Sequence, residues 1–176
     1  LNMINAPGAG SGDVCTYMWA CAICDENEAC QKDKEGHSRW LVAKRMERIE
    51  YNGWPECIRL SNAKIDLVIT TVVGPRIIRV GFVGERNEFW EKPEDQGQQG
   101  GDEWRIYGGH RLWHSPEAMP RSYYPDNGPV HVDPLSGGVR LIQSTEPTTG
   151  IRKEMDVQLS PKEAYVRVTH RLRNDG

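Results

Sequence analysis

The chain has 176 residues, a formal net charge of −3 and 27% charged residues, which together describe one polar domain. So mild a charge excludes a general attraction to nucleic acid or to an anionic membrane, and no apolar run approaches the length of a membrane-spanning helix. We therefore predict neither a nucleic-acid partner nor a membrane partner. The 18 glycines and 11 prolines are typical of a β-protein with many turns.

Residues 1–45 differ in character from the rest of the chain. They show no sustained hydrophobic period, and an apolar patch at Val14–Cys24 is followed by the charged run Asp25–Glu35. The first basic residue is Lys32, so the basic region that opens a signal peptide is missing. We predict an irregular N-terminal extension over residues 1–45. Because Met46 opens a stretch typical of a natural start, one interpretation is that this extension is not native.

Four of the five cysteines lie in this extension, at positions 15, 21, 24 and 30, and Cys57 lies outside it. The spacing of Cys21 and Cys24 is that of a zinc knuckle, but structural zinc sites join two such close pairs across a longer loop. Zinc binding by the extension is an open alternative to a segment without function. Because no cysteine framework crosses the main body, we expect a cytoplasmic protein.

From Met46 onward the hydrophobic period is two, and we predict one all-β domain over residues 46–176. The strands expected are Lys64–Val73, Arg76–Val83, Val139–Thr145, Ile151–Leu159 and Ala164–Arg173. The last two alternate between apolar and polar residues, which indicates a hairpin of amphipathic strands. We expect no helix after Met46. Short strands joined by Gly/Pro turns predict an antiparallel β-sandwich or barrel.

The long stretch between residues 92 and 130 carries most of the chemistry, with Trp104–Glu117 (WRIYGGHRLWHSPE) at its centre. Two glycines allow a sharp bend or the close approach of a ligand, and an imidazole, a guanidinium and an indole follow them. Such groups suit sugar hydroxyls and the apolar face of a sugar ring. The predicted substrate-binding residues are Arg105, Gly108, Gly109, His110, Arg111, Trp113, His114 and Glu117. The alternative is a glycine turn followed by a strand that faces water.

A metal site formed by His110, His114 and Glu117 is the less favoured interpretation. Positions four apart share one face of a helix, but the preceding glycines and Pro116 argue against a helix here. On a strand these histidines would lie roughly 13 Å apart, too far to hold one ion. We predict no metal and no cofactor. His170 lies among aliphatic residues and is expected to be a core histidine.

The segments Gly74–Ile78 (GPRII), Asn87–Phe89 (NEF) and Trp104–Trp113 together resemble the galactose mutarotase-like (aldose 1-epimerase) superfamily, in particular bacterial members with a GGHRLW-type motif. The resemblance covers roughly Leu60–Gly176. It implies a supersandwich, a fold of two large stacked antiparallel sheets. It also implies that Arg105 and the Gly-Gly-His motif line the concave binding face. Arg111 stands where several members of the family carry Pro.

What the resemblance implies for function is a small-molecule sugar partner and interconversion of sugar anomers. In that reaction a carboxylate takes the proton of the C1 hydroxyl while an imidazole protonates the ring oxygen, without a metal or a nucleotide. The family's acid His follows a strand like Ala164–Asn174, and its base Glu lies still later. We therefore assign no catalytic residue and expect residues 46–176 to be the N-terminal half of a domain that is incomplete at its C-terminus.

Two classes of function follow. The first is an aldose 1-epimerase-like isomerase, of which this chain forms the sugar-binding part. The second is a non-catalytic carbohydrate-binding module, and a metal-dependent cupin-like β-protein is a weaker third possibility. An incomplete sandwich would leave sheet edges uncovered, so self-association is expected as well.

Overall fold

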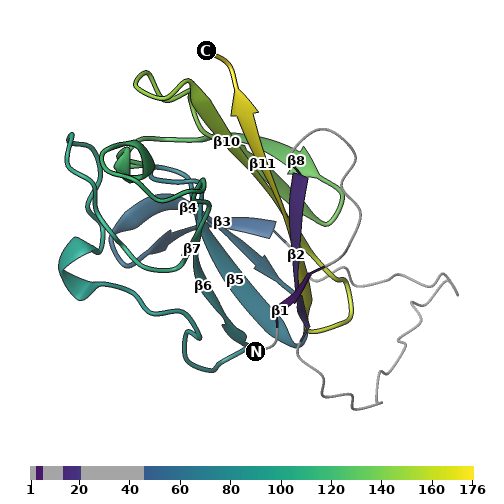
Figure 1. Cartoon of the computed structure of the whole chain (residues 1–176). Helices are drawn as coiled ribbons and strands as arrows, with labels where there is room; N and C mark the ends of the chain where they lie inside the picture. Colours follow the sequence, from purple (N-terminus) through teal and green to yellow (C-terminus); the bar gives the residue numbers. More distant parts are fainter. Residues whose placement is uncertain (1–2, 6–13, 21–45) are drawn as a thin grey trace, which may run out of the picture.

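The computed structural model describes residues 3–5, 14–20 and 46–176, and among these residues the strands form two antiparallel sheets (Figure 1). The first sheet has the order β1 (Met3–Asn5), β2 (Val14–Ala20), β11 (Tyr165–Asn174), β10 (Ile151–Leu159), β9 (Gly138–Ile142), β8 (His131–Leu135). The second has the order β3 (Met46–Tyr51), β4 (Trp54–Ser61), β5 (Ile65–Thr70), β6 (Arg76–Phe82), β7 (His110–Arg111). Two short 3₁₀ helices, η1 (Pro93–Asp95) and η2 (Arg121–Tyr123), lie in the long loops.

This architecture confirms the predicted all-β antiparallel sandwich. The finer predictions, a supersandwich and a domain incomplete at its C-terminus, stay predictions. Strand β10 has the predicted bounds, whereas β5 ends at Thr70 rather than Val73. The Thr70 hydroxyl donates to the Val73 carbonyl oxygen at 2.8 Å, so the chain already turns ahead of Gly74-Pro75.

The expectation of an irregular segment over residues 1–45 is wrong for two stretches. The structure assigns Met3–Asn5 and Val14–Ala20 to strands, and β2 pairs with β11 from Val14↔Arg171 to Ala20↔Tyr165. The β2 sequence (VCTYMWA) is rich in β-branched and aromatic residues, which suit a strand. Cys21, Cys24 and Cys30 lie outside the described residues, so zinc binding stays an open alternative and the non-native origin of the extension stays an interpretation.

The main core lies between the two sheets. It is formed by aliphatic side chains from strands of both, among them Leu67 and Ile69 of β5 and Met155 and Val157 of β10. Each of these is fully buried, and burying one such side chain contributes about 1.5–3 kcal/mol. Val166 and Val168 of β11 belong to this core, and His170 lies on the same face of that strand.

A second cluster covers the opposite face of the five-stranded sheet. It comprises Trp54, Cys57, Val68, Val73, Ile78 and Tyr107. The Trp54 indole N–H donates to the Gln98 carbonyl oxygen at 2.9 Å, which ties the long loop to this face. Strand β5 is consequently buried on both faces, as its nearly continuous apolar sequence indicates.

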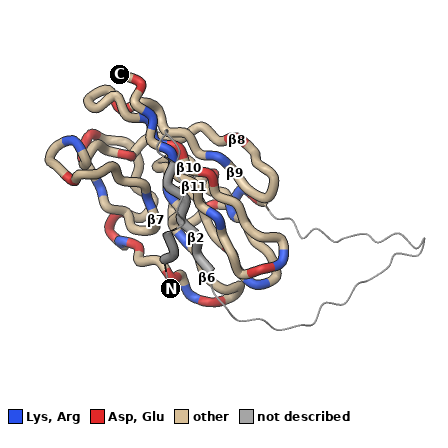
Figure 2. The backbone as a smooth tube through the Cα atoms, turned by 45° about the vertical axis from the view of Figure 1, so that its right-hand side comes forward, with Lys and Arg blue, Asp and Glu red and all other residues tan. Residues whose placement is uncertain are grey.

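The centre of the polar face of β10 is buried. Glu154 and Asp156 are buried because arginines of the neighbouring strands cover them. Asp156 pairs with Arg140 at 2.6 Å and with Arg171 at 2.8 Å, and Glu154 pairs with Arg173 at 2.6 Å. Figure 2 shows charges of both signs along β9, β10 and β11. The outer face of the sheet is thus a ladder of cross-strand ion pairs.

Candidate functional site

Arg76 holds the predicted glycine motif in place from the start of β6. Its side chain is buried, and one guanidinium nitrogen donates to the carbonyl oxygens of Ile106, at 3.0 Å, and Gly108. The other terminal nitrogen pairs with the Asp126 carboxylate at 3.0 Å. In the sequence, Arg76 stands out only as part of the resemblance. An arginine that opens an apolar strand was the signal that could have found it.

Gly108 and Gly109 are packed against the protein backbone. Both have positive φ, of 103° and 70°. A Cβ at Gly108 would overlap the Trp90 carbonyl oxygen, and one at Gly109 would overlap the Ile77 carbonyl oxygen. The predicted substrate-binding role of the two glycines stays a prediction, and their observed role is to let the loop lie directly on neighbouring chain.

Gly109→Ala is expected to lower the free energy of unfolding by about 2–3 kcal/mol, because the methyl group is both strained and overpacked. Gly84→Ala is the matched control, since its φ of 81° is similar and nothing lies within 4 Å of an added Cβ. It should cost only about 1 kcal/mol. Urea unfolding of the two variants measures the difference. Equal losses would contradict the packing role of Gly109.

His110 faces the core rather than the long loop. Its Nε2 lies 2.9 Å from Nε2 of His170, which comes from β11 in the opposite sheet. One of these nitrogens must donate and the other accept, so the tautomers of the two rings are linked. Burial, and secondarily the charge of Arg76, lowers the pKa of His110 to about 4; burial, then His110, lowers the pKa of His170 to about 4. The predicted core position of His170 is confirmed, because the residue is 2% exposed.

Arg111 follows His110 on β7 and lies in an aromatic group. Its guanidinium carbon is 5.4 Å from the ring centre of Trp104 and 4.9 Å from that of Trp113. Tyr123 contacts both indoles with ring centres 5.2 Å apart, and its hydroxyl donates to the Glu117 carboxylate. We call Trp104, Arg111, Trp113 and Tyr123 the aromatic group. Three predicted site residues, Arg111, Trp113 and Glu117, thus lie together.

The remaining two predicted residues make local structural contacts. His114 is buried, and its Nε2 lies 3.2 Å from the Arg121 carbonyl oxygen. Arg105 donates to the Gly100 carbonyl oxygen at 2.7 Å, which stabilises the loop around residue 100. His110 is separated from Arg111, Trp113 and Glu117 because successive residues of a strand point to opposite faces.

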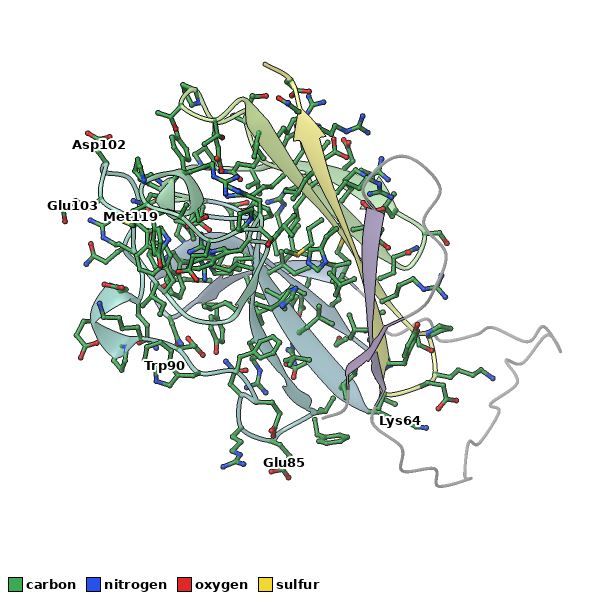
Figure 3. All side chains as sticks on the ribbon, viewed as in Figure 1. Lys64, Glu85, Trp90, Asp102, Glu103 and Met119 are labelled. Atoms are coloured by element: carbon green, nitrogen blue, oxygen red, sulfur yellow. The ribbon has the colours of Figure 1, made fainter. Side chains whose placement is uncertain are left out.

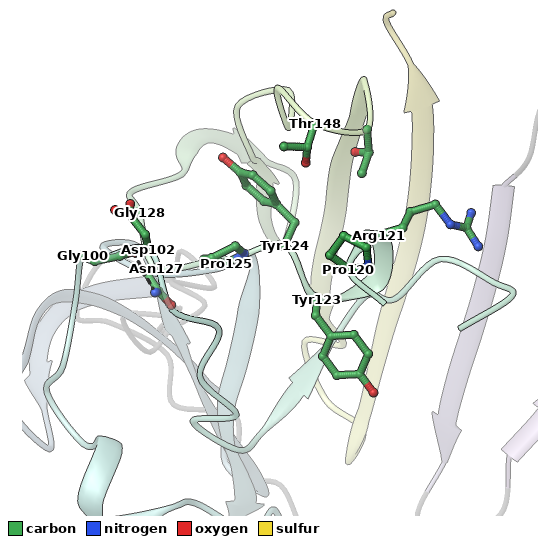
Figure 4. A pocket seen from close by; sticks show the side chains of 12 residues that line it. Gly100, Asp102, Pro120, Arg121, Tyr123, Tyr124, Pro125, Asn127, Gly128 and Thr148 are labelled. Carbon is green, nitrogen blue, oxygen red and sulfur yellow. Dashed lines mark hydrogen bonds between the residues drawn. The ribbon is translucent and has the colours of Figure 1, made fainter. Parts of the chain in front are cut away.

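A cleft of about 900 Å³ lies beside the aromatic group (Figure 4). It is lined by Gly100, Gly101, Asp102, Pro120, Arg121, Tyr123, Tyr124, Pro125, Asn127, Gly128, Thr148 and Thr149. Tyr123 belongs both to this lining and to the aromatic group. Figure 3 shows Asp102, Glu103 and Met119 on the outside of the long loops that form this side of the molecule.

None of the eight predicted residues lines the cleft directly. Most of the lining lies within residues 92–130, the stretch in which we predict the site, but the predicted centre of that site was the Gly-Gly-His motif. Asn127 fixes the wall of the cleft, because its amide donates to the carbonyl oxygens of Gly101 and Glu103. Thr148 and Thr149 come from the loop between β9 and β10, and no sequence pattern pointed to them.

Among the side chains that the structure describes, no group of three or more His, Cys, Asp or Glu residues is arranged to hold a metal ion. The described residues also contain no helix long and apolar enough to span a membrane. No protein-family model, curated protein or solved structure matches the chain. The cleft and the adjacent aromatic group are therefore the features from which a function is proposed.

Proposed function

We propose that the chain binds a carbohydrate in the cleft formed by the loops around residues 100–102, 120–128 and 148–149. The cleft itself carries this proposal, because about 900 Å³ is within the range of small-molecule sites and its lining combines aromatic rings with hydroxyl, amide and carboxylate groups. A sugar presents an apolar C–H face and a set of hydroxyls, so it needs both kinds of partner.

The lining suggests a role for each side. Tyr124 extends toward Thr148, while Tyr123 points to the opposite side (Figure 4). The Tyr123 ring contacts Trp104 and Trp113. We propose that the Tyr124 ring packs on the sugar ring and that Thr148 and Asp102 hydrogen-bond its hydroxyls. The amide of Asn127 is already engaged within the protein, so it shapes the wall.

His110 and His170 are poorly suited to act as general acids near neutral pH. A general acid works best with a pKa near the working pH, whereas the pKa values of His110 and His170 are both about 4. At pH 7 only about one molecule in a thousand would carry a proton on either ring. Anomer interconversion, which the resemblance implies for a complete domain, remains a separate proposal.

Saturation-transfer NMR with glucose and galactose tests binding. Transfer from the wild-type chain to the sugar protons is expected, and Tyr124→Ala should weaken binding about tenfold, since stacking and buried area of a tyrosine are worth about 1–2 kcal/mol. Tyr165→Ala is the matched control, because Tyr165 begins β11 and does not line the cleft. Equal binding by both variants would show that the sugar does not bind in the cleft. If no tested sugar received transfer from the wild-type chain, the proposal of carbohydrate binding would be wrong.

A further inference from the structure

The buried charges near the cleft do not balance. Arg76 pairs with Asp126 at 3.0 Å, and Lys153 pairs with Glu146 at 2.5 Å, all four side chains being at most 4% exposed. Arg111 is a third cation in the same region, and both carboxylates influence its pKa. Its closest carboxylate contact is 3.7 Å, to the Asp126 oxygen that Arg76 already occupies. One guanidinium is therefore left without a carboxylate of its own.

The hydrogen bonding of Arg111 is also incomplete. Its three guanidinium nitrogens are buried, and none has a hydrogen-bond partner in the part of the chain that the structure describes. Burial lowers the pKa of Arg111 to about 10, so the side chain still carries its charge at neutral pH. The faces of Trp104 and Trp113 compensate part of the cost, since a cation over an aromatic face is stabilised, but they leave all the N–H donors unused.

Tyr123 connects this cation with the cleft. Its ring lies against both indoles that enclose Arg111, and the same residue lines the cleft. Tyr123 is only partly buried, and its hydroxyl is held by Glu117, which is exposed. Tyr123 is thus the residue through which the cleft and the surroundings of Arg111 meet, and a change of its rotamer is what contact between the Arg111 donors and a ligand in the cleft would require.

We propose that the ligand of the cleft is an anionic carbohydrate, whose carboxylate or phosphate oxygens pair with Arg111. This inference rests on the proposed carbohydrate binding and adds the chemical class. A planar guanidinium matches two oxygens of either anion, and charge-assisted hydrogen bonds are about twice as strong as neutral ones. The negative charge of such a ligand would also balance the charge of Arg111, which has no carboxylate of its own.

The test follows tryptophan fluorescence of the full chain during titration with galactose, galacturonate, galactose 6-phosphate and inorganic phosphate. Trp104 and Trp113 enclose Arg111, so binding of the anion should change their emission. We expect at least one anionic sugar to bind tenfold or more tightly than galactose, and the two sugars distinguish a carboxylate from a phosphate. Arg111→Met should abolish this preference, whereas Arg86→Met, at a side chain 87% exposed, should retain it.

Stability separates a ligand-binding Arg111 from a structural one. Arg111 shares its one carboxylate with Arg76 and none of its nitrogens is hydrogen-bonded, so Arg111→Met removes a poorly compensated buried charge and should melt at or above the wild-type temperature without ligand. A variant that melts clearly lower, or does not fold, would overturn the inference. Equal affinity for galactose and both anionic sugars would overturn it while leaving the proposed function intact, and binding of no sugar would refute both. Inorganic phosphate binding as tightly as the sugar phosphate would show an anion site without carbohydrate selectivity and would also overturn it.

Discussion

Asp126→Asn is expected to lower the free energy of unfolding by about 3–5 kcal/mol, the cost of breaking a buried ion pair by removing one partner. The pair of Arg76 and Asp126 is almost fully buried, with side-chain exposures of 1% and 4%. Asp126 is also the carboxylate nearest to Arg111, at 3.7 Å. The substitution would thus leave two buried guanidinium groups without a counter-charge, and it would loosen the loop that Arg76 holds at Ile106 and Gly108.

Urea unfolding at pH 7 measures this loss. Arg48→Ala is the matched control, because Arg48 and Glu56 form an ion pair at 3.1 Å with exposures of 60% and 63%. An exposed pair contributes about 0–1 kcal/mol, so the control should stay near wild type. The double variant Arg76→Met/Asp126→Leu should recover part of the loss by removing both charges together. A change below 1 kcal/mol for Asp126→Asn would show that the pair does not hold this part of the fold.

Acidification is expected to destabilise the protein between about pH 6.5 and pH 4 through His110 and His170. Burial keeps the folded pKa of each near 4, whereas an unfolded histidine has a pKa of about 6.5. Between these values the unfolded chain binds more protons, so stability is complete above about pH 6.5 and falls as the pH approaches 4. Each histidine contributes about 3 kcal/mol to this loss. The summed loss from the two histidines is comparable with the free energy of unfolding of a typical domain.

Thermal melts at half-unit steps from pH 7.5 to pH 4 follow this effect. The double variant His110→Leu/His170→Leu should have a flatter profile over this range, because of the three buried histidines whose pKa is lowered only His114 remains. His131→Asn provides the control, since the His131 side chain is 70% exposed and pairs only with Asp133 on the surface. It should keep the wild-type profile. A steep profile that persists in the double leucine variant would place the acid sensitivity elsewhere.

Local alternation was enough to predict much of the sandwich. Ile151–Leu159 and Tyr165–Asn174 form the expected hairpin, because apolar residues at every second position can be buried together only in a strand. Lys64–Val73 was recognisable as a buried strand from its β-branched residues. The alternation could not reveal that Glu154 and Asp156 are buried as well. Their burial depends on arginines of β9 and β11, and strand pairing is not visible in one segment.

The arrangement of the candidate residues was harder to predict, for a related reason. The Trp104–Glu117 motif was correctly placed in a long loop, but His110 and Arg111 are neighbours on a strand and must point to opposite sides. His110 therefore meets His170, which is sixty positions away in sequence and lies in the other sheet. The cleft combines three loops, and Thr148 belongs to one that carries no motif. Such a site depends on tertiary contacts that a single sequence does not encode locally.

The most direct test of carbohydrate binding at the cleft is chemical-shift mapping on isotopically labelled chain during titration with galactose and galacturonate. The proposal predicts saturable shifts concentrated at residues 100–102, 120–128 and 148–149, with the indole signals of Trp104 and Trp113 responding to galacturonate. Shifts confined to the outer strands, or no shifts at sugar concentrations of tens of millimolar (about −2 kcal/mol of binding free energy), would contradict it.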